Sequence, residues 1–170
     1  YQAPPRQSFV LALKDVPEVW EISYDPKAPP IYDGFVHDFK MKEGLPKDGF
    51  LGIRRTALDE PLDDFFFSQN YAYALGASRP HADGSPSSQV VNLDVRRKIA
   101  DLPIHGMPHL GSGITFDWQG TRVLASPNLK EGTISVIDMK TWKLVKDIPT
   151  PGPGFFMRSH EATPYARTDS

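Results

Sequence analysis

The sequence predicts an all-β fold, built as about three and a half four-stranded blades of a larger β-propeller. Within residues 104–149, turn residues separate four short apolar runs, at 114–116, 122–125, 133–137 and 143–148. A strand that ends in aspartate also recurs: its two copies end at Asp94 and Asp138, which lie 44 residues apart. A period of about 40–45 residues is typical of propeller blades and has no reason to occur in a β-sandwich.

The elements follow this repeat along the chain. Residues 8–25 predict a hairpin, residues 62–102 one complete blade and residues 104–149 the next, while a partial blade begins at residue 151. We therefore expect residues 1–170 to form one partial propeller domain whose ring is incomplete at both ends.

An insertion at 26–60 interrupts the first blade. It carries His37, Arg54 and Arg55 together with several aromatic residues. Loops of this length inside compact domains are usually functional or disordered. Because of its aromatic residues and its pair of arginines, we expect an ordered lid over one mouth of the ring.

Composition excludes several classes of function. A net charge of −2 without a basic cluster argues against nucleic-acid binding. The absence of cysteine removes disulfides, thiolate nucleophiles and cysteine-based metal sites. No apolar run approaches the roughly 18 residues that a membrane-spanning helix needs.

The start of each innermost strand should line the central channel and its mouth. These positions include Asp63 and Asp64 in one blade and His109 in the next. Carboxylates and a histidine around a shared cavity could transfer protons or bind a metal. The glycines beside His109 would let a large flat ligand approach the backbone.

Each of these residues also has a purely structural interpretation. His109 could be an ordinary turn residue, and Asp63 or Asp64 could bond nearby backbone amides. Arg54 and Arg55 could form a solvated face. From the residues alone, the chain is a propeller with a polar mouth and no named substrate.

Three runs resemble the heme d1 propeller family: PLDD at 61–64, PHLGSG at 108–113 and GFFMRSH at 154–160. This family includes the d1 domain of cytochrome cd1 nitrite reductase, a dihydro-heme d1 dehydrogenase and a heme d1 biosynthesis protein. The resemblance implies an eight-bladed ring, heme d1 or dihydro-heme d1 as ligand or substrate, and a periplasmic location.

The resemblance also implies roles for residues. His109 matches a distal histidine of the reductase, whereas Asp63 stands where the reductase has its other distal histidine. A carboxylate is ionised near neutral pH and repels nitrite, which argues against nitrite reduction. A dehydrogenase of the family would also keep a histidine here, so Asp63 argues against that activity too, whereas an aspartate at this point resembles the biosynthesis protein. We therefore expect Asp63 and His109 to be catalytic. The residues expected to bind the cofactor are His37, Arg54, Arg55, Asp64, Arg158 and His160, and no metal ligand is assigned within the chain.

The resulting expectation is a heme d1 biosynthesis protein that binds heme d1 or its late precursor, either as a tetrapyrrole-modifying oxidoreductase or as a carrier. The alternatives are a dihydro-heme d1 dehydrogenase, a nitrite reductase d1 domain, and a non-catalytic interaction propeller. The expected partners are cytochrome cd1 nitrite reductase, other d1 maturation proteins and a second copy in a homodimer, with no nucleic acid.

Overall fold

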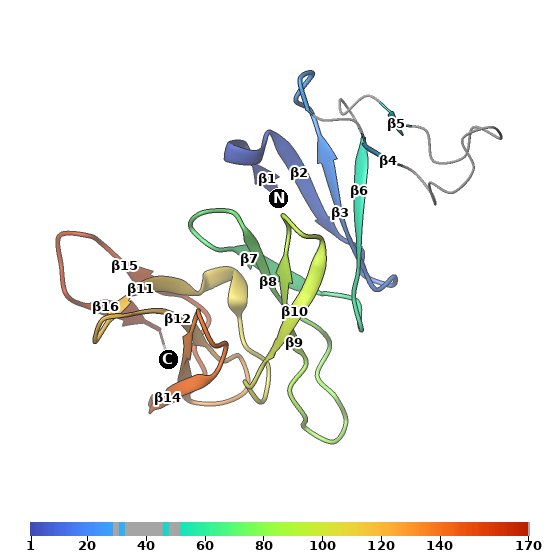
Figure 1. Ribbon diagram of the computed structural model, residues 1–170. Coiled ribbons are helices and arrows are strands. Elements are labelled where there is room, and N and C mark those ends of the chain that lie inside the picture. Colours follow the sequence, from blue (N-terminus) through green and yellow to red (C-terminus); the bar gives the residue numbers. More distant parts are fainter. Residues whose placement is uncertain (29–30, 33–45, 48–51, 170) are drawn as a thin grey trace.

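The computed structural model describes residues 1–28, 31–32, 46–47 and 52–169, and shows successive small β-sheets standing side by side (Figure 1). Three of the sheets have four strands, in the spatial orders β1-β2-β3-β6, β10-β9-β8-β7 and β11-β12-β13-β14. A two-stranded sheet, β15-β16, follows them. We call these blades I to IV in chain order, and they confirm the predicted propeller architecture.

The strands of blade I are β1 (Gln2–Ala3), β2 (Ser8–Ala12), β3 (Glu18–Ser23) and β6 (Ile53–Ala57). Blade II has β7 (Asp64–Phe67), β8 (Tyr73–Ala77), β9 (Ser88–Asn92) and β10 (Arg97–Leu102). Blade III has β11 (Ile114–Trp118), β12 (Thr121–Pro127), β13 (Thr133–Asp138) and β14 (Leu144–Pro149), and blade IV has β15 (Met157–Ser159) and β16 (Ala166–Thr168). Two 3-10 turns, η1 (Pro4–Arg6) and η2 (Leu110–Ser112), precede β2 and β11, and β4 (Ile31–Tyr32) pairs with β5 (Pro46–Lys47).

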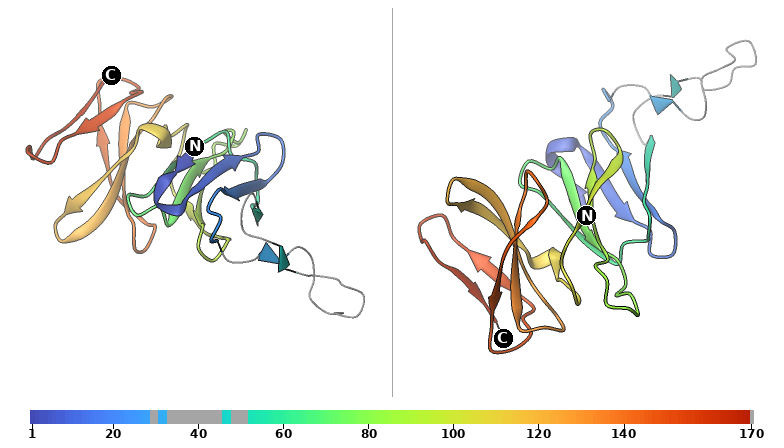
Figure 2. Two further views of the ribbon diagram at one scale, coloured as in Figure 1. Left: turned by 90° about the horizontal axis from the view of Figure 1, so that it is seen from above. Right: turned by 60° about the horizontal axis from the view of Figure 1, so that its bottom comes forward.

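The apolar cores lie between the blades. On β8 and β9, Ala74 and Val91 pack toward blade I, whereas Leu75 and Val90 pack toward blade III. Because successive side chains of a strand point to opposite faces, a sheet covered on both faces reads as a continuous apolar run. The two further views show this stacking of one sheet against the next (Figure 2).

Two details of the sequence prediction need correction. The segment Ile53–Ala57 is β6, the outermost strand of blade I, so Arg54 and Arg55 belong to the blade and the insertion is shorter than 26–60. The repeat is also offset from the pair Asp94 and Asp138. Asn92 accepts the amides of the turn after β9, as Asp138 does after β13, so the structural period here is 46 residues.

The hairpin between β11 and β12 turns tightly at Gln119 and Gly120, which both have positive φ. Among the described residues, no helix has the length and apolar character needed to cross a membrane.

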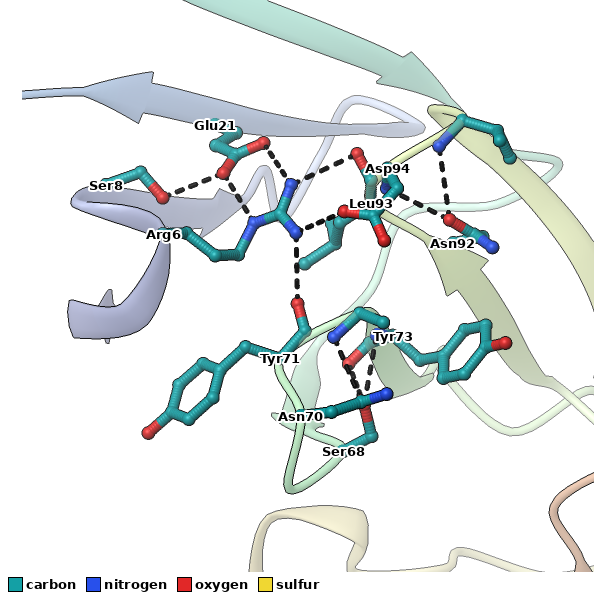
Figure 3. Close-up of polar contacts among 12 residues, drawn as sticks. Arg6, Ser8, Glu21, Ser68, Asn70, Tyr71, Tyr73, Asn92, Leu93 and Asp94 are labelled. Atoms are coloured by element: carbon teal, nitrogen blue, oxygen red, sulfur yellow. Dashed lines mark hydrogen bonds and ion pairs between the residues drawn. The ribbon is translucent and has the colours of Figure 1, made fainter. Parts of the chain in front are cut away.

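Arg6, on η1, joins blade I to blade II (Figure 3). Its Nε and one terminal nitrogen donate to the two carboxylate oxygens of Glu21 at 2.7 and 3.1 Å. Its remaining hydrogens reach the carboxylate of Asp94 at 2.5 Å and the carbonyl oxygens of Tyr71 and Leu93 at 3.2 and 3.3 Å. All five N–H donors of the guanidinium are therefore used.

This ion pair is well enclosed. The side chain of Arg6 is 18% exposed and that of Glu21 is 7% exposed, and Ser8 donates a further bond to Glu21 at 2.8 Å. Burial lowers the pKa of Arg6, but hydrogen bonds to Glu21 and Asp94 outweigh this, and the pKa lies above its ordinary value. The charge therefore remains on Arg6 at every physiological pH. We call the contacts of Arg6 with Glu21 and Asp94 the Arg6 clamp.

We predict that Arg6→Met lowers the free energy of unfolding by about 3 kcal/mol, because it leaves the Glu21 carboxylate buried without its partner. The measurement is urea unfolding of the natural protein. The double variant Arg6→Met with Glu21→Met should recover much of the loss. Arg79→Met removes the ion pairs of an exposed arginine with Asp15 and Asp63 and serves as the control, with an expected change under about 1 kcal/mol. Equal losses in Arg6→Met and Arg79→Met would contradict the clamp.

Candidate functional site

The starts of the innermost strands converge on one mouth of the blade stack. Asp64 begins β7, His109 directly precedes η2 and β11, and Phe155 and Phe156 directly precede β15. Contacts between these residues cross from blade II to blade III and from blade III to blade IV. We call Asp64, His109, Ser112, Phe155 and Phe156 the His109 cluster.

Asn128 fixes the loop that carries His109. This side chain is 2% exposed, and its Oδ1 accepts the amides of Met107, Lys130 and Glu131 at 3.0–3.2 Å. Its Nδ2 donates to the carbonyl of His105 at 2.8 Å, and the amide of His109 bonds the carbonyl of Pro127. Buried polar groups that are fully satisfied in this way hold a loop in one conformation.

The ring of His109 has a defined protonation pattern. Its Nδ1 lies 2.6 Å from the carbonyl oxygen of Phe155. A carbonyl oxygen can only accept, so Nδ1 carries the hydrogen and Nε2 of the neutral ring carries the lone pair. The ring also packs against Phe155, with centroids 4.2 Å apart, and its side chain is 20% exposed.

Asp64 faces His109 across the boundary between the blades. Its Oδ2 lies 3.9 Å from Nε2 of His109 and accepts the amide of Gly111 at 3.1 Å. A Cβ atom on Gly111 would lie 2.6 Å from this oxygen, so glycine is needed for the carboxylate to approach the loop. The missing side chain of Gly111 thus makes room for Asp64, and the approach of a flat ligand to these glycines stays a prediction.

Tyr1 completes this side of the cluster. Its hydroxyl donates to Oδ1 of Asp64 at 3.5 Å, and its ring packs edge-on against Phe65 with centroids 5.0 Å apart. Burial first, and the charge of Asp64 second, raise the pKa of the Tyr1 hydroxyl.

Phe155 and Phe156 present two aromatic rings to solvent, 47% and 49% exposed, with centroids 4.6 Å apart. One carboxylate oxygen of Asp169 accepts both of their amides at 2.7 Å. These two backbone bonds hold the pKa of Asp169 below its usual value. Gly154 is required beside them, because a Cβ there would lie 2.7 Å from the carbonyl oxygen of Asp169.

The predicted catalytic residues Asp63 and His109 contact different partners. Asp63 contacts Arg79, with Oδ2 and Nε 3.5 Å apart, and Arg79 also reaches Asp15. The neighbour Asp64 is the carboxylate that meets His109. Sequence spacing could not decide between the two, because adjacent residues at a strand start point to opposite faces.

The predicted cofactor-binding residues are also divided. Arg158 lies beside the cluster, with its guanidinium carbon 5.7 Å from the centre of the Phe156 ring. Arg54 and Arg55 lie on the outermost strand of blade I, where Arg55 stacks over Trp20 at 4.8 Å. His37 lies outside the described residues.

His160 lies at the far end of β15 from Phe155, in the loop that leads to β16. It lines a cavity of about 590 Å³ together with Phe116, Trp118, Arg122 and Tyr165. The structure therefore does not bring His160 to the His109 cluster. In the described part of the chain, no group of three or more His, Asp or Glu side chains is placed to hold a metal ion.

Comparison with known proteins identifies the class. The family model of the cytochrome D1 heme domain matches residues 48–170, which include the whole His109 cluster. The chain belongs to the cytochrome D1 heme domain family, as the runs at 108–113 and 154–160 had predicted.

Particular relatives narrow the comparison. A dihydro-heme d1 dehydrogenase of Pseudomonas aeruginosa is 46% identical over 170 residues, which cover 100% of this chain and 29% of that protein. A solved structure of dihydro-heme d1 dehydrogenase NirN in complex with DHE has a TM-score of 0.77 at 44% identity, covering 98% of this chain and 30% of that one. The chain thus spans less than a third of the length of these relatives.

A hydrazine synthase of Kuenenia stuttgartiensis shares the fold alone. Its TM-score is 0.51 at 12% identity, over 92% of this chain and 36% of that one. The similarity to a dehydrogenase matches an alternative that the argument from Asp63 had disfavoured. The Asp63 carboxylate on which that argument rests contacts Arg79.

The depressed pKa of Asp169 predicts a pH-dependent contribution to stability. Because the folded-state pKa is lowered, this contribution is fully present above the pKa of the unfolded chain and is lost as pH falls through the folded-state pKa. Thermal unfolding of wild type and Asp169→Asn should therefore differ at about pH 7 and converge toward about pH 3. Glu161→Gln, an exposed carboxylate in the same hairpin, is the control. A difference that is independent of pH would contradict this assignment.

Proposed function

We propose that the protein binds dihydro-heme d1 or heme d1 at the His109 cluster and acts in heme d1 maturation as a dihydro-heme d1 dehydrogenase. The observation that carries this proposal is the contact of His109 Nδ1 with the Phe155 carbonyl, which leaves Nε2 available beside two exposed phenyl rings, in a chain 46% identical to such a dehydrogenase.

The residues present fit a tetrapyrrole. Phe155 and Phe156 are half exposed and offer aromatic faces against which a flat macrocycle can pack. Arg158, beside Phe156, supplies a permanent positive charge for a carboxylate of the macrocycle. Nε2 of His109 is free of hydrogen, so it can accept a hydrogen bond or donate its lone pair to iron.

Dehydrogenation removes two electrons and two protons from the dihydro-tetrapyrrole and leaves one additional double bond. The macrocycle and its iron supply the redox chemistry when bound. The two electrons pass one at a time to two equivalents of an external one-electron acceptor, while one proton goes to His109 and the other to solvent. The chain's own residues orient the macrocycle and receive protons. His109 accepts a proton at Nε2, and Asp64, 3.9 Å away, stabilises the resulting imidazolium.

A carrier role within heme d1 biosynthesis is the second candidate. Asp63 favours it, because this residue stands where the biosynthesis protein of the family has an aspartate. A carrier would bind the tetrapyrrole at the same cluster and release it unchanged. The remaining expectations from the resemblance belong to this proposal too: an eight-bladed ring, a periplasmic location, a homodimer, and cytochrome cd1 nitrite reductase and other d1 maturation proteins as partners.

The test is a visible-spectrum titration of the natural protein with dihydro-heme d1 and with heme d1. We expect His109→Ala to raise the apparent Kd by about tenfold or more, or to shift the spectrum of the bound tetrapyrrole, because the group facing the ligand is removed. The matched control is His105→Ala, an exposed histidine four residues upstream whose Nδ1 contacts the carbonyl of Gly84. Asp64→Asn should reduce turnover with an external acceptor more than it reduces binding.

Three results would overturn parts of this proposal. Unchanged titrations in His109→Ala would remove the cluster from the binding site. Tight binding without conversion of dihydro-heme d1 in the presence of an acceptor would favour the carrier. No spectral change at micromolar protein would remove the tetrapyrrole altogether and leave an interaction propeller.

A further inference from the structure

We infer that Ser112 and Asp169 are positioning residues that fix His109 as the Nδ1–H tautomer with Nε2 toward the mouth. This inference rests on the proposed function for its role, although the tautomer itself is independent of any ligand. It assigns a task to two residues that have no role in the proposed chemistry.

Ser112 bridges the two partners of the histidine ring. Its hydroxyl donates to the carbonyl of Phe155 at 2.5 Å and lies 2.9 Å from Nδ1 of His109. The side chain is buried, and η2 folds it back under His109 because the amide of Ser112 bonds the carbonyl of His109 at 3.1 Å. A hydroxyl that donates to one group keeps its lone pairs for another. Ser112 can therefore accept from Nδ1–H while it holds the Phe155 carbonyl in place.

Asp169 holds that same carbonyl from the other side. By accepting the amides of both Phe155 and Phe156, it fixes the peptide planes that flank the Phe155 residue. The amide of Asp169 returns a bond to the carbonyl of Phe156 at 3.3 Å, so the turn is tied twice to the end of β16. The acceptor for Nδ1 therefore has little freedom to rotate away.

Both halves of this arrangement depend on Asn128. Its side chain holds the loop of His109, and its carbonyl accepts the amide of Gly154 at 3.0 Å, next to Phe155. The positions of His109 and of the Phe155 carbonyl are thus both fixed by hydrogen bonds to one buried residue of blade III. If the ring flipped, a carbon atom would face the Phe155 carbonyl and the bond would be lost, which costs about 1 kcal/mol or more.

The consequence for a ligand is directional. Metal-binding and proton-accepting histidines usually donate their second nitrogen to a carbonyl or carboxylate, which fixes the ring and raises its basicity. Loss of such partners typically lowers affinity by about 10-fold or more. Ser112 and Asp169 act on the ligand through His109 and contact it themselves in no step of the proposal.

The experiment uses natural, ligand-free protein with ¹⁵N-labelled histidine. The ring ¹⁵N shifts of His109, identified by their loss in His109→Gln, report which nitrogen is protonated. We expect an Nδ1–H ring in wild type, and a mixture of tautomers with about tenfold weaker dihydro-heme d1 binding in Ser112→Ala and Asp169→Ala. Ser112→Thr and Asp169→Asn keep the hydrogen-bonding oxygens and should retain the wild-type tautomer.

Matched controls exist in the same blades. Ser135→Ala removes a buried hydroxyl of blade III that donates to the carboxylate of Asp147, and Asp138→Ala removes a carboxylate that accepts two consecutive turn amides. Neither contacts His109, so both should leave its ring shifts unchanged. Should Ser112→Ala fail to fold, Ser112→Cys, which offers only a weak hydrogen-bonding thiol, takes its place with the same expectation.

The outcomes separate this inference from the function. An Nε2–H ring in wild type, or ring shifts unchanged in both alanine variants, overturns the positioning role whether or not the protein binds a tetrapyrrole. A fixed Nδ1–H ring that loosens in those variants supports it even if His109→Ala binds dihydro-heme d1 as wild type does. In that last case the proposed binding site fails and the positioning role stands.

Discussion

Burial of apolar side chains between successive blades is the interaction on which the rest of this structure depends. The three apolar cores lie at blade boundaries, and residues that alternate along β8 and β9 supply two of them. At about 25 cal/mol per Å² of apolar surface removed from water, such faces contribute most of the favourable free energy of folding. A blade is thus positioned by its neighbours, and residues that bind a common ligand from different blades are placed by this packing.

Polar contacts then fix the relative position of neighbouring blades, because apolar faces alone could pack against each other in several positions. Arg6 saturates all five donors between blades I and II, and the Asp64 carboxylate bonds the Gly111 amide between blades II and III. The Phe155 carbonyl bonds His109 between blades III and IV. Each of these contacts is directional and is lost if the blades slip by one residue. The hydrophobic effect holds the stack together without direction, whereas these bonds set its register.

Much of the fold was predictable from local patterns, because strand and turn chemistry in a propeller repeat within about 45 residues. The hairpin at Gln119 and Gly120 and the boundaries of blades II and III follow from such patterns. The last strand of blade I was misassigned because β6 pairs with β3 across an insertion, and nothing local marks that pairing. The Asp94 repeat was offset because Asn92, and not Asp94, accepts the amides of the turn after β9, whereas the carboxylate of Asp94 binds Arg6.

In the site, too, local sequence predicted some features, whereas others depend on residues that are distant in sequence. The run at 108–113 predicted His109 as a site residue, because a histidine among glycines can be recognised from the local sequence. Its partners Phe155 and Asp169 are remote in sequence and could not be predicted in this way. Which member of the pair Asp63 and Asp64 meets His109 depends on strand rotation, which two adjacent identical residues cannot reveal. The chemistry of His109 follows from these remote partners: a carbonyl on Nδ1 leaves the lone pair on Nε2. With the same flanking motif, a neighbouring blade that donated a hydrogen bond to Nδ1 would favour the opposite tautomer, so the reactivity of His109 depends on the boundary between blades and not on the motif alone.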